Sequence, residues 1–271
     1  MLCQVEGIVI RSTDYGEGNK IITLYARETG KAAIMVRGAK KTGSRHSAIA
    51  QLFTHGHYIY YLSRPGAMGT LNSGEIVEAH HGLRENLQMT AYSAYLAEMT
   101  DRILGEQDAS DFLFSQLAAA LNAIEEGKDP QIIAHIFEMK MLEAAGYAPA
   151  LEQCVACGTG LGTQIPRGQD GPVSAADAGA ADAGAFSSES GGWLCPRCRR
   201  RDPSAVDISL ATLRLMRLFQ KMDLRNLGKI ELKAATRAQL GRIIRSFFDT
   251  HIPIQWKSRN FIEQMEKFYI V

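Results

Sequence analysis

Long apolar runs and a strong net charge are both missing from this chain of 271 residues. No stretch approaches the roughly eighteen uncharged apolar residues that cross a membrane. The N-terminal segment MLCQVEGIVIRS contains Glu6 and lacks the basic lead and uninterrupted apolar run of a secretory signal. We therefore expect a cytoplasmic protein with no membrane partner.

Known catalytic motifs are missing as well. The sequence has no G-x-S-x-G nucleophile, no H-E-x-x-H pair, and no deaminase H-x-E motif beside its C-x-x-C pairs. Gly38 and Gly43 have the spacing of a phosphate-binding loop, but Ser44-Arg45 stands where Lys-Ser/Thr is required, which excludes nucleotide hydrolysis by that motif. These absences predict a binding protein rather than an enzyme.

Cysteine is scarce, with five residues in the chain, but four of them form two C-x-x-C pairs. The pairs are Cys154/Cys157 and Cys195/Cys198, and a reducing cytoplasm favours metal binding over disulfides. Two such knuckles supply four thiolates in a tetrahedron, which leaves no open position for catalysis. We predict one structural zinc ion per chain. A redox role for the two pairs is the alternative.

The charges are distributed unevenly along the chain. Residues 1–80 carry nine Lys/Arg and six Asp/Glu, residues 81–153 carry four and twelve, and residues 154–271 carry seventeen and eleven. The net charges are therefore +3, −8 and +6. Two basic ends around an acidic middle predict polyanion-binding surfaces at the ends and another task for the middle.

The hydrophobic periodicity predicts a multi-domain α+β fold. Five short strands are expected at about 5–10, 20–27, 31–36, 52–62 and 70–79, which suits a five-stranded OB-fold barrel, with an SH3-like barrel as the alternative. Helical spacing follows at about 83–99, 112–124, 130–145, 209–222, 235–248 and 258–269. We expect an OB-fold domain at 1–80, a helical domain from 81–153 and 199–271, and a zinc module at 154–198.

One low-complexity segment lies inside the expected zinc module. Residues 168–192 contain seven alanines and six glycines and no Lys or Arg. Such a composition buries too little apolar surface to offset the entropy of ordering, so we predict a flexible insertion.

Two basic clusters are candidates for DNA binding. The first lies in the loop after the third expected strand, and the second begins within the second cysteine knuckle and continues along a helix. The alternative for both is a solvated charged surface. The candidates are Arg37, Lys40, Lys41 and Arg45 in the first cluster, and Arg197, Arg199, Arg200, Arg201, Arg214, Arg217 and Lys221 in the second.

Tyr58 and Tyr60 share one face of the fourth expected strand, because side chains alternate along a strand. Aromatic rings near a basic loop can stack on bases, so both residues are candidates for base stacking. The alternative is that they belong to the barrel core.

The order of these features resembles the RecO family of bacterial recombination mediators. The resemblance rests on the opening V-x-G-I-V-I-R at 5–11, the R-G-A-K-K loop at 37–41, an acidic helical segment, the paired C-x-x-C knuckles and the C-terminal KSRNF at 257–261. It covers the chain except residues 168–192.

The resemblance implies an OB-fold that binds single- and double-stranded DNA, annealing of complementary strands, and association with the nucleoid during repair. It also implies RecR and the tail of the single-strand DNA-binding protein as partners, and help in loading RecA. Arg37, Lys40 and Lys41 match the DNA-binding loop of the family's barrel. A zinc-containing RNA-binding or transcription-related protein is the second hypothesis, and a thiol enzyme is the third.

Overall fold

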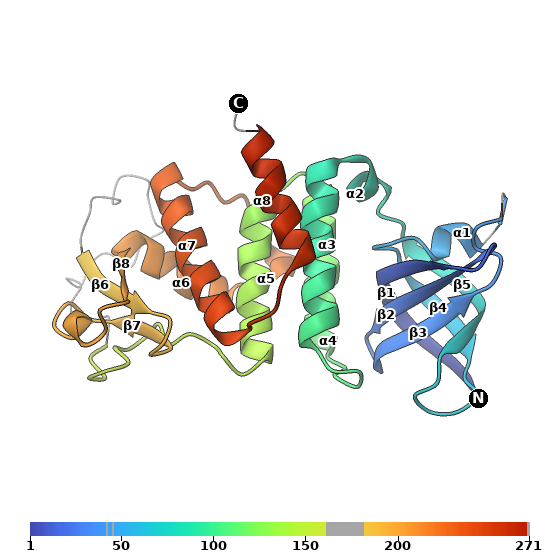
Figure 1. Ribbon diagram of the computed structural model, residues 1–271, viewed down its shortest axis with the longest axis horizontal. Coiled ribbons are helices and arrows are strands. Elements are labelled where there is room, and N and C mark those ends of the chain that lie inside the picture. The colour runs from blue at the N-terminus through green and yellow to red at the C-terminus, as the bar shows by residue number, and fades with distance from the viewer. Residues whose placement is uncertain (42, 45, 161–181, 270–271) are drawn as a thin grey trace. The chain divides into compact units, whose positions relative to one another are not determined.

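A computed structural model describes residues 1–41, 43–44, 46–160 and 182–269 (Figure 1). Two compact units divide the chain, the first formed by residues 1–137 and 256–271 and the second by residues 138–255. This division differs from the expected domains, because the C-terminal helix belongs to the first unit.

The N-terminal part of the first unit is a closed barrel. Its elements are β1 (Leu2–Tyr15), β2 (Asn19–Ala26), β3 (Gly30–Val36), α1 (His46–Ile49), β4 (His55–Tyr61) and β5 (Gly69–Glu78). The strand order is β1-β2-β3-β5-β4, with β3 and β5 parallel and the other neighbours antiparallel. This five-stranded barrel confirms the predicted OB-fold. The short helix α1 was not predicted.

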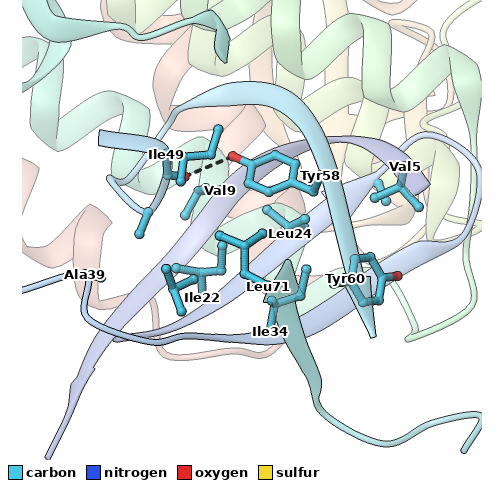
Figure 2. Close-up of a cluster of buried hydrophobic side chains, with 13 residues drawn as sticks. Val5, Val9, Ile22, Leu24, Ile34, Ala39, Ile49, Tyr58, Tyr60 and Leu71 are labelled. Carbon is cyan, nitrogen blue, oxygen red and sulfur yellow. Dashed lines mark hydrogen bonds between the residues drawn. The ribbon is translucent and has the colours of Figure 1, made fainter. Parts of the chain in front are cut away.

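The barrel core explains the strand pattern. Alternate apolar residues of β2 and β3, among them Ile22, Leu24, Ile34 and Val36, point inward and are fully buried. Tyr58 lies in the same cluster, where its hydroxyl donates to the carbonyl oxygens of Ile49 and Thr54 at 3.2 Å each (Figure 2).

Burial also corrects the prediction about base stacking. Tyr58 is 0% exposed and Tyr60 is 3% exposed. The rings fill the barrel, so neither has a free face for a base, and the prediction that they stack on DNA is wrong.

Five helices complete the first unit, although the unit boundary falls within one of them. They are α2 (His81–Glu85), α3 (Leu87–Ile103), α4 (Asp111–Glu125), α5 (Pro130–Ala144) and α8 (Lys257–Tyr269). Ser110 caps α4, because its hydroxyl accepts from the N–H of Leu113 at 3.2 Å.

The last helix, α8, lies beside α3 (Figure 1). Glu98 of α3 accepts from the backbone N–H groups of Lys257 and Ser258 at 3.1 and 2.9 Å, and a carboxylate there satisfies N–H groups that have no partner within the helix. Tyr92 donates its hydroxyl to Glu266 at 2.7 Å. These contacts place the C-terminal residues in the first unit.

The second unit combines a small sheet with two helices. Its elements beyond α5 are β6 (Asp182–Ser187), β7 (Gly192–Leu194), η2 (Arg199–Arg201), β8 (Val206–Ser209), α6 (Leu210–Lys221), η3 (Leu224–Asn226) and α7 (Ala234–His251). The sheet order is β7-β6-β8. Ser209 caps α6 and accepts from the N–H of Thr212 at 3.2 Å.

The prediction of a flexible insertion is wrong for residues 182–192, which form β6, a turn and the start of β7. The remainder of that prediction lies outside the described residues. Small residues are used here for close packing rather than flexibility. Gly184 has φ +102°, and a Cβ there would lie 2.1 Å from the carbonyl oxygen of Leu194. Phe186 anchors β6 by packing edge-on against Phe247, with ring centroids 5.3 Å apart.

Among the helices that the structure describes, none is both long and apolar enough to span a membrane.

Candidate metal centre and nucleic-acid interface

The two C-x-x-C pairs meet in the second unit. The four Sγ atoms all lie within 4.8 Å of one another. Each knuckle is closed by a tight backbone turn: the N–H of Gly158 donates to the carbonyl of Cys154 at 2.8 Å, and that of Cys198 to the carbonyl of Cys195 at 2.9 Å. Gly158 takes a left-handed φ of +71°, which glycine adopts without strain. The predicted grouping of Cys154, Cys157, Cys195 and Cys198 is confirmed.

The thiols are poised for a cation. Hydrogen bonds with the side chain and the backbone of Thr159 lower the pKa of Cys157 to about 6. The hydrogen bond to Cys157, together with burial, raises the pKa of Cys198 to about 12. Four thiols this close cannot all ionise without a positive ion between them, because each thiolate disfavours the next.

The geometry of the cluster fits a tetrahedral metal. Sulfurs at a zinc–sulfur distance of about 2.3 Å lie roughly 3.8 Å apart in a tetrahedron, and Cys157 Sγ and Cys195 Sγ are 3.8 Å apart. The backbone N–H of Cys195 also points at Cys154 Sγ, 3.4 Å away. A four-sulfur site of this kind suits zinc or iron. These residues can therefore hold a metal ion.

The surroundings of the cluster are rigid. Trp193, two residues before Cys195, is fully buried and donates its indole N–H to the carbonyl of Ala183 at 2.6 Å. Arg201 donates to the carbonyl of Ala156 at 3.3 Å and so links the two knuckles. The small sheet and the cysteines therefore form one packed module.

The predicted arginine cluster lies on the surface of this module. Arg197, Arg199, Arg200 and Arg201 are all exposed. Arg199 pairs with Asp207 at 2.5 Å. The cluster is brought together by the second knuckle and the following 3₁₀ turn.

The basic face of α6 is largely neutralised. Arg217 and Lys221 both form ion pairs with Glu152, the latter at 2.7 Å, while Arg214 is half-buried on the same helix. Hydrogen bonds from Lys221 and Arg217 lower the pKa of Glu152 and keep it ionised at neutral pH. Residues three and four apart share a helix face, as predicted, but one carboxylate covers two of the three cations.

The barrel loop presents its cations outward. Arg37, Lys40 and Lys41 are exposed, whereas Arg45 lies outside the described residues. Lys40 pairs with Asp14 at 2.7 Å, and the hydrogen bond from Lys40 lowers the pKa of Asp14.

Backbone contacts fix the loop on the β1–β2 turn. The N–H of Gly38 donates to Asn19 Oδ1 at 3.0 Å, and the N–H of Lys40 donates to the carbonyl of Gly18 at 3.1 Å. The loop cations are therefore held at one end of the barrel.

Other barrel cations are paired with acidic residues. Lys31 lies 3.8 Å from Asp101 and 3.5 Å from Glu106, and Arg11 lies 3.5 Å from Asp101. Arg27 binds Glu6 and Asp111 in the same way. The acidic segment therefore neutralises one side of the barrel.

The cations without an ion pair to any described residue lie elsewhere on the barrel. These are Lys20, Arg37, Lys41 and Arg64. The first three belong to the end that carries the loop.

Comparison with known proteins identifies the family. Residues 1–80 match the domain family described as Recombination protein O N terminal, and residues 84–260 match Recombination protein O C terminal. This chain belongs to the RecO family. The DNA repair protein RecO of Bacillus subtilis is 40% identical over 266 residues, covering 98% of this chain and 96% of that protein.

Two further relatives have the same name. DNA repair protein RecO of Halalkalibacterium halodurans is 38% identical over 98% of this chain and 96% of its own length. That of Bacillus mycoides is 37% identical over 100% of both chains. The present chain is therefore a DNA repair protein of the RecO family. The resemblance to this family that the sequence features indicated is confirmed over residues 1–80 and 84–260.

The sequence did not point to several residues of this RecO-family site. Glu152 and Asp14 reduce the basic character of two predicted surfaces, and Thr159 contacts the cysteine cluster at 3.2 Å. Glu152 lies 69 residues from Lys221 in the chain, so no local spacing reveals the pair. Thr159 could have been found from its position two residues after Cys157, in the turn of the first knuckle.

Proposed function

We propose that this RecO-family protein is a recombination mediator that binds single- and double-stranded DNA through its basic surfaces and anneals complementary strands. One observation carries the proposal: acidic residues pair with Arg11, Arg27 and Lys31 on one side of the barrel, while Arg37 and Lys41 have no ion pair to a described residue and Lys20 only faces Asp14 across the strand. Free cations at one end of an OB-fold form a surface for a phosphodiester backbone.

Contacts of this kind suit a mediator, which has to act on any sequence. Lys and Arg bind phosphates without reading bases, and they screen the repulsion between two strands that must approach. The arginine cluster on the cysteine module, Arg197 and Arg199–Arg201, supplies a second phosphate-binding surface. We propose no reading of the base sequence by the helical domain or the metal module. We also propose no making or breaking of covalent bonds by this protein.

The partners in the proposal follow from the family. They are RecR, the acidic tail of the single-strand DNA-binding protein, and RecA indirectly, with the protein located in the cytoplasm at the nucleoid during repair. The metal in the cysteine cluster is zinc in this proposal, because zinc prefers four-thiolate structural sites in a protein of this kind.

Strand annealing tests the proposal. Two complementary oligonucleotides coated with the cognate single-strand DNA-binding protein are expected to anneal faster with this protein than without it, and the gain is expected to fall as salt rises. The same assay with RNA strands separates the proposal from an RNA-binding role. Annealing that is unchanged by the protein, or a preference for RNA, contradicts the proposal.

Glu152→Gln tests the α6 surface separately. Removal of the carboxylate frees Arg217 and Lys221. Affinity for DNA is therefore expected to rise roughly two- to fivefold at low salt, which corresponds to about one added phosphate contact. The measurement is a fluorescence titration with labelled duplex at several salt concentrations.

Glu143→Gln is the matched control, because Glu143 is an exposed carboxylate near the end of α5 and has no ion pair to an α6 cation among the described residues. An equal rise in both variants indicates a general charge effect, and no rise in Glu152→Gln removes α6 from the DNA-binding surface.

A further inference from the structure

The exposed aromatic residues of the barrel are few. Residues 1–80 contain six aromatic side chains. Four are buried, and two are exposed: Tyr15 at 52% and Tyr61 at 54%. They lie at opposite ends of β1, since Tyr15 is its last residue and Tyr61 pairs with Leu2. The buried set is Tyr25, Phe53, Tyr58 and Tyr60.

Tyr15 points to the outside of the sheet. The register of β1 against β2 shifts between Val9 and Arg11, and beyond this bulge Ser12 is opposite the core residue Ile22. Side chains alternate along a strand, so Tyr15 lies on the opposite, outward face. Its cross-strand neighbour there is Asn19.

Arg37 extends the same outward row. Lys20 pairs with the core residue Val36, so Asn19, the first residue of β2, and Arg37, the residue that follows β3, come next along these two segments. The hydrogen bond from the N–H of Gly38 to Asn19 Oδ1, at 3.0 Å, holds this corner together. Tyr15 and Arg37 therefore flank Asn19 on one face.

An apolar strip continues this face toward the middle of the barrel. Thr13 pairs with Ile21, and Ile21 pairs with Met35. Ile21 and Met35 are both half-buried. We call the six residues Thr13, Tyr15, Asn19, Ile21, Met35 and Arg37 the outer face. It combines an exposed ring, a free guanidinium and apolar side chains, which is the chemistry that holds an unpaired base and its phosphate.

We propose that Tyr15 stacks on an unpaired base and gives the outer face its preference for single-stranded DNA. The inference rests on the proposed DNA-binding function and adds the residue that distinguishes a single strand from a duplex. In a duplex the base faces are covered by neighbouring bases, so the ring has nothing to stack on. Phosphate contacts from Arg37 and Lys41 serve both forms of DNA.

Three variants of Tyr15 and Tyr61 test the inference in the full chain. Tyr15→Ala is expected to lower affinity for a labelled oligo-dT by roughly fivefold or more. Affinity for a duplex of the same length is expected to stay within about twofold, and the dependence on salt is expected to be unchanged, because no phosphate contact is lost. Tyr15→Phe keeps the ring and is expected to bind like the parent protein. Tyr61→Ala is the matched control, with the same exposure at the other end of β1 and no expected loss.

The outcomes separate this inference from the function on which it rests. Equal losses for single-stranded and duplex DNA in Tyr15→Ala, or a loss in Tyr61→Ala instead, overturn the role of Tyr15. Unchanged affinity for single-stranded DNA in Tyr15→Ala also overturns the role of Tyr15. If the Lys40→Glu/Lys41→Glu variant binds more weakly in the same titration, the proposed DNA binding by the barrel loop still stands. Thermal unfolding of each variant checks that the barrel is preserved, as expected for substitutions at exposed side chains.

Discussion

Cys154→Ser is expected to remove the bound metal and unfold the cysteine module. Three thiolates and a hydroxyl make a weaker site, and the buried position of Cys154, 2% exposed, leaves little room for water to replace the ligand. Binding of structural zinc is worth about 10 kcal/mol or more in small zinc domains, so we expect the free energy of unfolding of the second unit to fall by at least ~3 kcal/mol.

The module contains its own reporter for this experiment. Trp193 is one of two tryptophans in the chain, and it is buried next to the second knuckle. In a Trp256→Phe background, its emission is expected to shift to the red in Cys154→Ser at a temperature where the parent is folded. Metal content is measured by elemental analysis, with one zinc per chain expected in the parent and much less in the variant.

Cys3→Ser is the control, because Cys3 is half-buried in the barrel and lies outside the cluster. It is expected to keep the metal and the Trp193 emission. If the parent protein has no metal after purification with zinc and reductant, and its four clustered thiols react freely while it is folded, then the cluster is not a structural metal site.

The DNA affinity that remains in Cys154→Ser is a second measurement in this experiment. The barrel belongs to the other unit and contains none of the four ligands. We therefore expect that any remaining affinity still depends on Lys40 and Lys41. The metal supports the arginine cluster and does not itself contact DNA in this proposal.

Local patterns in the sequence were enough for the barrel strands, the longer helices and the cysteine cluster, but not for α1 or the small sheet. Apolar and aromatic residues predicted the five barrel strands, because most of these strands bury one face; in β5 only the start of the strand, around Leu71, is buried. The knuckle spacing predicted the cysteine cluster, because two residues between cysteines allow both sulfurs to face one ion.

Contacts between distant segments were beyond those patterns. The side chain of Glu152 neutralises cations 65 and 69 residues away, so a helix face that is basic in the sequence is not basic in the structure. Tyr58 looks like a stacking residue from its position beside a basic loop, but the closed barrel buries it. The small residues of β6 predict a flexible insertion, because disordered segments have the same composition. In the structure these residues instead allow the backbone to approach its neighbours closely, as at Gly184.

Charge reversal in the barrel loop is expected to have the largest effect on DNA binding. In Lys40→Glu/Lys41→Glu, affinity for both single-stranded and duplex DNA is expected to fall at least roughly tenfold at about 0.1 M salt, because Lys41 loses its phosphate contact and the two new carboxylates, together with the unpaired Asp14, repel the backbone. The slope of log affinity against log salt is expected to flatten by about 0.7 per lost contact for single strands. Annealing of complementary strands is expected to slow in parallel.

Asp14→Asn has the opposite expected sign. Asp14 binds Lys40 at 2.7 Å, and its lowered pKa keeps it charged at neutral pH. Removing this charge frees Lys40 for a phosphate, so affinity is expected to rise by roughly two- to fivefold, with a steeper dependence on salt. A change in folding does not readily explain a gain in DNA affinity when Asp14 loses its charge together with a loss when the charge of its partner Lys40 is reversed.

Arg64→Glu is the matched control for the single variant Lys41→Glu. Both residues are exposed barrel cations without an ion pair to a described residue, and both substitutions change the charge by the same amount. Arg64 lies in the β4–β5 connection, whereas Lys41 packs against Gly18 in the β1–β2 turn, with its side chain 3.8 Å from the position of a Gly18 Cβ. If DNA binds the end of the barrel that contains the loop, Lys41→Glu weakens binding much more than Arg64→Glu. Equal losses mean that total charge decides, and a larger loss at Arg64 moves the DNA to the other connection; either result contradicts the assignment of the loop.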